Sequence, residues 1–196
     1  MIDAARIPHC MTVADFQDWV PEAALADRRW SLVDGEPICM APTSENHGAI
    51  RSEAAYLITQ HLRASGSPCR VITAPGVIPR VRSISNERIP DLGVTCSQAL
   101  GARAIADPVV LIEILSPSNE AQTRANVWAY ATIPSVMEIL LLSSTSISGE
   151  LLRRNSLGQW ADDPLMLDAT SQMHLAAIGF NALLRDFYVT TSLAAQ

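Results

Sequence analysis

Two apolar, β-branched runs of strand length, at residues 89–96 and 109–115, constrain this chain more than any other feature. Both are bounded by Pro, Gly and Ser, which is typical of strands that turn at their ends. Each carries one carboxylate in otherwise apolar surroundings, Asp91 near the start of the first run and Glu113 near the end of the second. An ionised carboxylate is costly to bury unless it is paired or bound to a cation. Two of them on neighbouring strands therefore suit a divalent metal, because hard cations take oxygen ligands.

A simpler interpretation stays open at this point. Asp91 can be a turn residue at the start of its strand, and Glu113 can be the partner of an arginine. The side-chain period of two in a strand places Leu111, Glu113 and Leu115 on one face. Glu113 then lies close to the exit of its strand, where active sites on such sheets often open.

Composition and charge describe a globular chain. Of the 196 residues, 48% are hydrophobic and 17% are charged, which indicates one folded domain over 1–196 rather than disorder. No apolar run approaches the roughly 20 residues needed to cross a bilayer, and no signal peptide is visible, so we expect a cytoplasmic protein. The four cysteines have no C-x-x-C spacing and are expected to be reduced thiols: Cys10, Cys39, Cys69 and Cys96.

The net charge of −6 does not indicate an extensive electrostatic interface with nucleic acid. It does not exclude a nuclease, because an acidic metal site contributes to the same count. All 14 basic residues are arginine, and the chain contains no lysine.

The order of predicted elements gives the fold class. The first half contains a short helix opened by Thr12 and ended by Pro21, hairpin strands at 29–33 and 37–40 around Asp34-Gly35, a helix from 45 to about 64, and strands at 70–73, 76–82, 89–96 and 109–115. The second half contains a helix from about 120 to 132, a strand at 136–143, small edge strands at 150–154 and 164–168, and a closing helix at 181–188. The helix at 120–132 is expected to bury Ala121, Ala125, Trp128 and Ala131 or their neighbours. This order predicts a mixed α/β (α+β) domain whose central sheet is flanked by two main helices, with an N-terminal helix and hairpin.

Several other candidate motifs are weak. Glu45 and His47 precede the first long helix, and each has two interpretations: a functional residue, or a carboxylate favoured by the helix dipole and a surface histidine. Ser116 and Ser118 are not in a G-x-S-x-G pattern, so a nucleophile elbow is not expected. There is no glycine-rich phosphate loop and no zinc-type His/Cys spacing.

Taken together, several short segments resemble one known family. They are Asp34-Gly35-Glu36, Met40-Ala41-Pro42, Glu45-Asn46-His47-Gly48, Ile89-Pro90-Asp91-Leu92-Gly93-Val94, Glu113-Ile114-Leu115-Ser116-Pro117-Ser118, and Tyr130 followed by Ile133-Pro134-Ser135-Val136 and Glu138. In this order they are similar to the Uma-type restriction endonucleases of the PD-(D/E)XK nuclease superfamily, most strongly over residues 11–160. The resemblance implies a restriction-endonuclease-like fold and Mg²⁺-dependent (or Mn²⁺-dependent) phosphodiester hydrolysis, with DNA as the substrate and a homodimer as the assembly.

The resemblance also implies roles for particular residues. Asp91 and Glu113 match the two acidic positions that ligate the metal, and a metal held there would polarise the phosphate and activate a water molecule. Glu45 matches a carboxylate that is a further ligand or a support for the ligands. The remaining supporting residues that the resemblance suggests are His47, Ser116 and Asn126.

This chain departs from the pattern at the lysine. The superfamily places lysine two residues after the second acid, which is Leu115 here, and the family commonly supplies it from the following helix, at Asn126 or Val127. Only Arg124 brings positive charge to that helix; its pKa is too high for a general base, but it can hold a phosphate through two hydrogen bonds. Arg124 is therefore the third predicted catalytic residue, and Arg124→Ala is expected to lower cleavage by about two orders of magnitude.

Two functions of different class follow. In the first, the protein is a metal-dependent endodeoxyribonuclease with an altered site. In the second, it is a degenerate nuclease fold kept for binding or regulation, as the missing lysine suggests.

Overall fold

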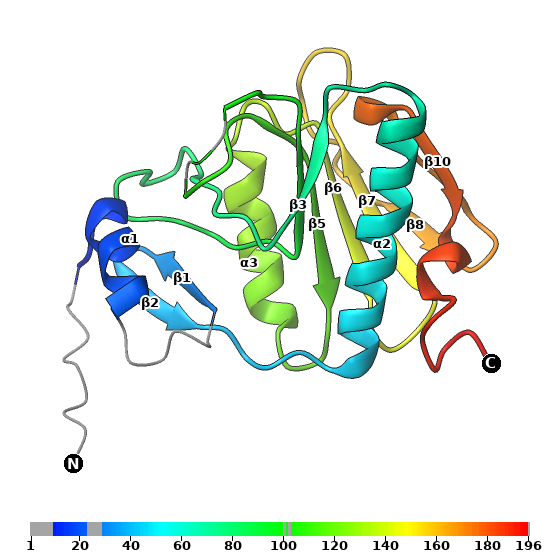
Figure 1. Cartoon of the computed structure of the whole chain (residues 1–196), viewed down its shortest axis with the longest axis horizontal. Coiled ribbons are helices and arrows are strands. Elements are labelled where there is room, and N and C mark those ends of the chain that lie inside the picture. Colours follow the sequence, from blue (N-terminus) through cyan, green and yellow to red (C-terminus); the bar gives the residue numbers. More distant parts are fainter. Residues whose placement is uncertain (1–9, 23–28, 100, 102, 196) are drawn as a thin grey trace.

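The computed structural model of the chain describes residues 10–22, 29–99, 101 and 103–195 (Figure 1). Its helices and strands, in chain order, are α1 (Val13–Glu22), β1 (Trp30–Val33), β2 (Glu36–Cys39), α2 (Glu45–Ala64), β3 (Arg70–Thr73), β4 (Leu92–Thr95), β5 (Pro108–Leu115), α3 (Glu120–Ala131), β6 (Glu138–Ser143), β7 (Ser148–Arg153), β8 (Leu165–Asp168), β9 (Gln172–Leu175), a 3₁₀ helix η1 (Ala176–Ile178), β10 (Phe180–Leu183) and a second 3₁₀ helix η2 (Leu184–Tyr188).

A six-stranded mixed sheet forms the centre, with the strand order β3-β4-β5-β6-β7-β8. The strands β5 and β6 pair in parallel through the crossover helix α3, and every other neighbouring pair is antiparallel. Helices cover both faces: in Figure 1, α2 and the C-terminal segment lie to the right, whereas α3, α1 and the β1–β2 hairpin lie to the left. This arrangement confirms the predicted fold class.

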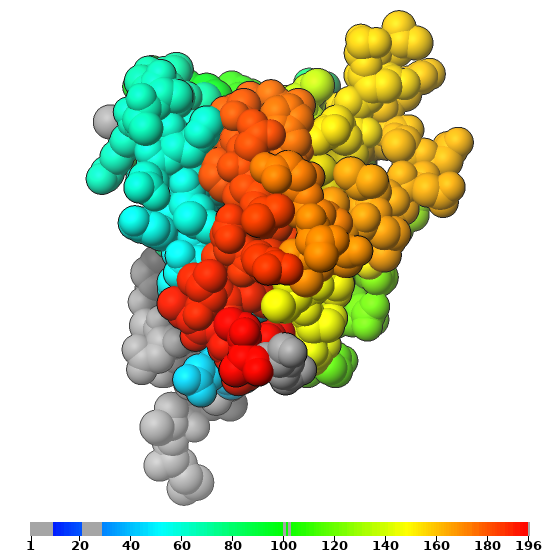
Figure 2. Space-filling view, turned by 90° about the vertical axis from the view of Figure 1, so that its right-hand side faces the viewer, coloured from blue at the N-terminus to red at the C-terminus, as the bar shows by residue number. Residues whose placement is uncertain are grey.

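One face of the sheet carries the larger apolar cluster. Ile50, Ala54 and Ile58 of α2 pack there against sheet side chains that include Ile112 and Ile114 of β5. The C-terminal segment completes this layer with Phe187, Tyr188 and other buried side chains. Figure 2 shows that segment, in orange and red, lying beside α2 in cyan. Burial of aliphatic residues on alternate positions of β5 follows the strand period of two.

The opposite face of β5 belongs to α3. Leu111 packs there against Val127 and Tyr130, so Glu113, two residues further along the strand, also points toward α3. The face of α3 that is buried is not the predicted one, however: Trp128 is 79% exposed, and the buried residues of the helix are Thr123, Asn126, Val127, Ala129 and Tyr130. The prediction chose alanine and tryptophan by apolarity, whereas the helix turns polar side chains inward, toward Glu113.

The N-terminal helix and hairpin form where local sequence predicts them, although α1 continues through Pro21 to Glu22. Thr12 and Asp15 make a reciprocal capping box, in which the Thr12 Oγ1 accepts from the Asp15 N–H at 3.2 Å and Asp15 Oδ2 accepts from the Thr12 N–H at 3.0 Å. Asp34 and Gly35 have φ values of 50° and 87°, as a two-residue type I′ hairpin turn requires. In Figure 1 the chain then runs from β2 along the lower edge of the molecule to α2, past the end of β5.

Two predicted elements are wrong. Residues 76–82 form isolated bridges at Gly76 and Val77 and then a turn, not a strand. Residues 181–188 form the strand β10 and a 3₁₀ helix rather than an α-helix, because β10 pairs with β9 over Phe180–Leu183. In both places tertiary pairing outweighs the local apolar pattern.

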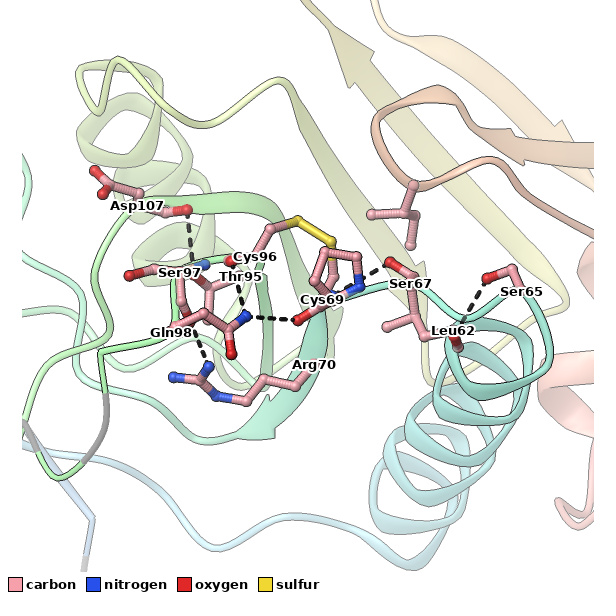
Figure 3. The surroundings of a disulfide bond; sticks show 12 residues. Leu62, Ser65, Ser67, Cys69, Arg70, Thr95, Cys96, Ser97, Gln98 and Asp107 are labelled. Carbon is pink, nitrogen blue, oxygen red and sulfur yellow. Dashed lines mark hydrogen bonds between the residues drawn. A yellow bond between two sulfur atoms is a disulfide. The ribbon is translucent and has the colours of Figure 1, made fainter.

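A disulfide joins Cys69 and Cys96, so the expectation of reduced thiols is wrong for these two residues. They face each other across the β3–β4 pair, one position beyond the partners Arg70 and Thr95. Figure 3 shows the bond beside the end of α2, with the Arg70 guanidinium donating to the Ser97 carbonyl. Sequence spacing could not reveal this pair, because the two strands that bring the thiols together are joined by an irregular segment.

Within the described residues, no helix is both long enough and apolar enough to cross a membrane.

Candidate active site

Asp91 lies immediately before β4, buried to 3% exposure and enclosed by hydrogen bonds. Its Oδ2 accepts from the Ile114 N–H at 2.9 Å. Its Oδ1 lies 2.8 Å from His47 Nε2 in the first turn of α2. The capping of α2 by Ser44, whose Oγ accepts from the His47 N–H, places the imidazole at this point. His47 is therefore a buried partner of Asp91, not a surface histidine.

Glu113 is 4% exposed and meets Asp91 through the backbone. Its Oε2 accepts from the Asp91 N–H at 3.3 Å, while the Asp91 side chain binds the amide of the next residue after Glu113. Its Oε1 accepts from the Tyr130 hydroxyl at 2.7 Å and from Asn126 Nδ2 at 3.4 Å. The two carboxylates are thus fixed next to each other, one from each of two paired strands.

The two acids have opposite pKa shifts. Burial raises the pKa of Asp91, but the hydrogen bond and charge of His47 and the N–H of Ile114 outweigh burial and bring that pKa below its ordinary value of 3.8. Burial and the charge of Asp91 raise the pKa of Glu113 to about 8, against the opposing hydrogen bonds from α3. The site therefore holds one carboxylate that stays ionised and one that keeps its proton near neutral pH. A divalent cation between them would favour the ionised form of both.

Two arginines surround the same carboxylate. Arg29 Nη1, just before β1, lies 3.5 Å from Asp91 Oδ1, and Arg51 Nη1 on α2 lies 3.8 Å from the same oxygen. Each arginine side chain is 28% exposed, so both lie between the buried Asp91 carboxylate and solvent. Both guanidinium groups therefore place positive charge beside Asp91.

The acids open into a cavity of about 220 Å³. Its walls come from the hairpin, the 40–43 segment, α2, the ends of β4 and β5, and α3; they include Arg29, His47, Asp91, Glu113, Ser116, Asn119 and Asn126. A second, more open groove of about 830 Å³ shares Arg29 and the 39–43 segment with this cavity and extends along Arg51. The hairpin forms one wall of this cavity, beside the ends of the interior strands β4 and β5.

The structure brings five of the predicted site residues to this cavity and leaves two outside it. Inside are Asp91, Glu113, His47, Ser116 and Asn126. Glu45 is exposed in the first turn of α2, where a carboxylate suits the helix dipole. Among the described residues, no three His, Cys, Asp or Glu side chains form a ready-made metal-binding group.

Arg124 lies elsewhere. Its Nη2 and Nη1 donate to Glu150 of β7 at 2.8 and 3.1 Å, and its Nε donates to Glu120 at 3.1 Å. It lines a separate cavity beside Trp128. The structure therefore does not bring Arg124 to the two acids.

Sequence reasoning missed both arginines at Asp91. Arg51 follows His47 by four residues, so the helix period alone places them on one face and could have identified Arg51. Arg29 carries no local signal, because only the docking of the hairpin brings residue 29 to residue 91. Tyr130 served in the sequence only as a motif marker, yet it is a direct partner of Glu113.

The donor set fits a hard divalent ion. Both acids offer carboxylate oxygens, and an ionised carboxylate has about four acceptor sites, so the hydrogen bonds described leave some free. Mg²⁺ is commonly bound by one or two carboxylates with water in the remaining positions. Asp91 and Glu113 are therefore the residues that would hold such an ion.

Comparisons with known proteins show which family this chain belongs to. The model of the Uma2 family, described as "Putative restriction endonuclease", matches residues 13–184. The uncharacterized protein slr1290 of Synechocystis sp. is 32% identical over 151 residues, which cover 76% of this chain and 77% of that protein. A crystal structure from Anabaena variabilis, described as a "putative nuclease belonging to DUF820", superposes with a TM-score of 0.72 at 15% identity over 91% of this chain and 97% of that one. The shared architecture is the restriction-endonuclease-like fold, and the chain belongs to the Uma2 family of restriction-endonuclease-like proteins.

Proposed function

We propose that this protein is a metal-dependent nuclease that hydrolyses phosphodiester bonds, with Asp91 and Glu113 as ligands of Mg²⁺ or Mn²⁺. The observation that carries the proposal is the reciprocal contact between the two buried acids: each is hydrogen-bonded to the backbone beside the other, and both line one cavity. Membership in the Uma2 family supports a nuclease activity and a nucleic-acid substrate, and proteins with this fold generally use a divalent metal.

Each side chain has a defined part in this proposal. His47 orients Asp91 and stabilises its charge through the 2.8 Å contact. Tyr130 and Asn126 hold Glu113 from α3. A divalent ion supplies Lewis-acid stabilisation of the phosphate and a more acidic water molecule. The raised pKa of Glu113 means that ion binding and proton release from Glu113 are coupled, so affinity for the ion rises with pH.

The missing lysine changes how phosphate charge is stabilised. Leu115 stands at the superfamily position, and Asn126 donates to Glu113 instead of offering an amine. Arg29 and Arg51 are the cations at Asp91 in the described structure. The sequence analysis predicts instead that Arg124 stabilises the phosphate charge, which would require its guanidinium to leave Glu150. The Arg124→Ala experiment in the Discussion tests that prediction.

A degenerate fold that only binds nucleic acid is the second candidate, favoured by the absence of any lysine. Titration calorimetry with Mn²⁺ and Mg²⁺, followed by cleavage assays on single- and double-stranded DNA and RNA, separates the two. We expect metal binding by the parent, no binding by Asp91→Asn, and metal-dependent cleavage that the same substitution removes. Metal binding without cleavage of any substrate would favour the binding role, and no metal binding at all would refute the proposed site.

Cytoplasmic residence, an endonucleolytic cut in DNA and a homodimer complete this proposal as expectations from the sequence. Sedimentation velocity at tens of micromolar tests the dimer, and a monomer at that concentration would contradict it.

A further inference from the structure

The groove beside the active-site cavity contains donors that the site itself does not use. Arg29 Nη1 is buried and has no hydrogen-bond partner among the described residues. Its distance of 3.5 Å from Asp91 Oδ1 is an ion-pair contact, and Arg51 Nη1 is further away at 3.8 Å. A guanidinium has five N–H groups in a planar fork that matches a phosphate. Arg29 Nη1 itself is buried against Asp91, but among the described residues no hydrogen bond engages the other N–H groups of these two side chains, and both side chains line the groove. Those remaining N–H groups are the donors for a ligand in the groove.

The position of these donors matters because the groove and the cavity meet. Arg29 lines both, and the 39–43 segment forms a common wall. Because the two hollows share these residues, a nucleic-acid strand with one phosphate at Asp91 and Glu113 can place a neighbouring phosphate in the groove. Arg29 and Arg51 lie at that junction.

The enclosure of the acids selects the form of the substrate. Asp91 and Glu113 are only 3% and 4% exposed, and they line a cavity of about 220 Å³. A double helix is a wide, stiff body that cannot enter such a cavity, whereas one unpaired strand can pass through a narrow channel.

We propose that Arg29 and Arg51 form a clamp for the phosphate next to the scissile one, and that the substrate enters as a single, unpaired nucleic-acid strand. This inference rests on the proposed nuclease function and adds the substrate form and two positioning residues. The groove is lined by Cys39, Met40, Pro42 and other non-aromatic side chains. Recognition is therefore by phosphate charge, without base stacking, and is insensitive to base sequence.

Binding without cleavage tests the clamp. Fluorescence anisotropy in EDTA compares a labelled single-stranded DNA oligonucleotide with a blunt hairpin duplex of the same sequence. We expect the single strand to bind at least about tenfold more tightly than the duplex. Arg51→Ala should weaken single-strand binding by about tenfold, as for loss of one charge-assisted contact, and should reduce the slope of log affinity against log salt by about 0.7.

The matched control is Arg63→Ala, which removes an exposed arginine from the same helix α2. Arg63→Ala should leave both affinity and salt slope unchanged. Arg29→Gln is a second test variant, for use if Arg51→Ala lowers the stability of the fold. Glutamine keeps a polar side chain at position 29 but removes the charge. Equal affinity for single strand and duplex would overturn the proposed substrate form. Equal effects of Arg51→Ala, Arg29→Gln and Arg63→Ala would overturn the clamp.

The result stays separate from the question of catalysis. Because EDTA removes divalent ions, the binding assay gives its answer whether or not the parent protein cleaves. A protein that binds single strands through Arg51 but shows no cleavage with Mg²⁺ or Mn²⁺ would support the clamp and refute the nuclease. Cleavage by the parent, together with single-strand binding that Arg51→Ala does not weaken, would support the nuclease and refute the clamp.

Discussion

In the metal-free protein, the free energy of unfolding should fall as the pH rises from about 5 to about 8, and Glu113→Gln should remove most of that fall. The folded chain keeps the Glu113 proton up to a pKa of about 8, whereas the unfolded chain releases it near the ordinary value of 4.5. Between these values the folded state binds more protons than the unfolded state. The contribution of the Glu113 proton to the free energy of unfolding is therefore complete below pH 4.5, decreases between pH 4.5 and 8, and is absent above pH 8.

The magnitude follows from the width of the interval. Each pKa unit corresponds to about 1.4 kcal/mol, so the full shift sets an upper bound of about 5 kcal/mol. Asp91, whose pKa is lowered from 3.8, acts in a different range: its contribution is lost as pH falls below that value. The two acids therefore do not cancel between pH 5 and 8. Glutamine keeps the size of the side chain and an acceptor for Tyr130 but carries no titrating group.

Urea unfolding at pH 5, 6, 7 and 8 in EDTA measures this effect. The parent should lose several kcal/mol across the series, and Glu113→Gln should lose much less and become the more stable protein at pH 8. Adding Mg²⁺ or Mn²⁺ at pH 8 should restore stability to the parent and not to the variant, since only the parent has both ligands. Parallel pH profiles for the two proteins would show that Glu113 titrates normally and would refute the reasoning.

Three further predictions concern other contacts. Tyr130→Phe removes a hydrogen bond to Glu113 and should raise the Glu113 pKa further and destabilise the fold by about 1.5–3 kcal/mol above pH 8, with a smaller loss at pH 5, as urea unfolding would show. The Cys69–Cys96 bond closes a sequence separation of 27 residues, so its reduction by dithiothreitol should lower the free energy of unfolding by about 3 kcal/mol; an unchanged urea midpoint would contradict this. Arg124 pairs with Glu120 and Glu150, so Arg124→Ala should lower the free energy of unfolding by about 1 kcal/mol or less and leave cleavage unchanged. A hundredfold loss of cleavage would instead support a catalytic role for Arg124.

The sequence by itself determined the elements whose signals are local. The Asp34-Gly35 turn, the helix from Glu45 to Ala64 and the buried strand that carries Glu113 are all where the patterns predict them. Such signals work because turn geometry, helix capping and side-chain period depend on residues only a few positions apart. The order of motifs also identified the family.

The tertiary structure alone decided which charges meet those acids. Arg29 and Asp91 are far apart in the chain and come together through the docking of the hairpin. Arg124, although close to Glu113 in sequence, instead pairs with Glu150 of β7. Local pattern cannot distinguish these outcomes, because the partner of a long, flexible side chain depends on which element packs beside it.

The same reason explains the errors in α3 and in the disulfide. Apolarity predicted that Trp128 would be buried, but α3 instead turns Asn126 and Tyr130 toward the buried Glu113 carboxylate. A buried carboxylate requires hydrogen-bond donors, and these two side chains supply them. Cys69 and Cys96 become neighbours only when β3 pairs with β4. The sequence thus determines the strands and the acids they carry, whereas strand pairing and helix packing determine the partners that set the charge, enclosure and chemistry of the site.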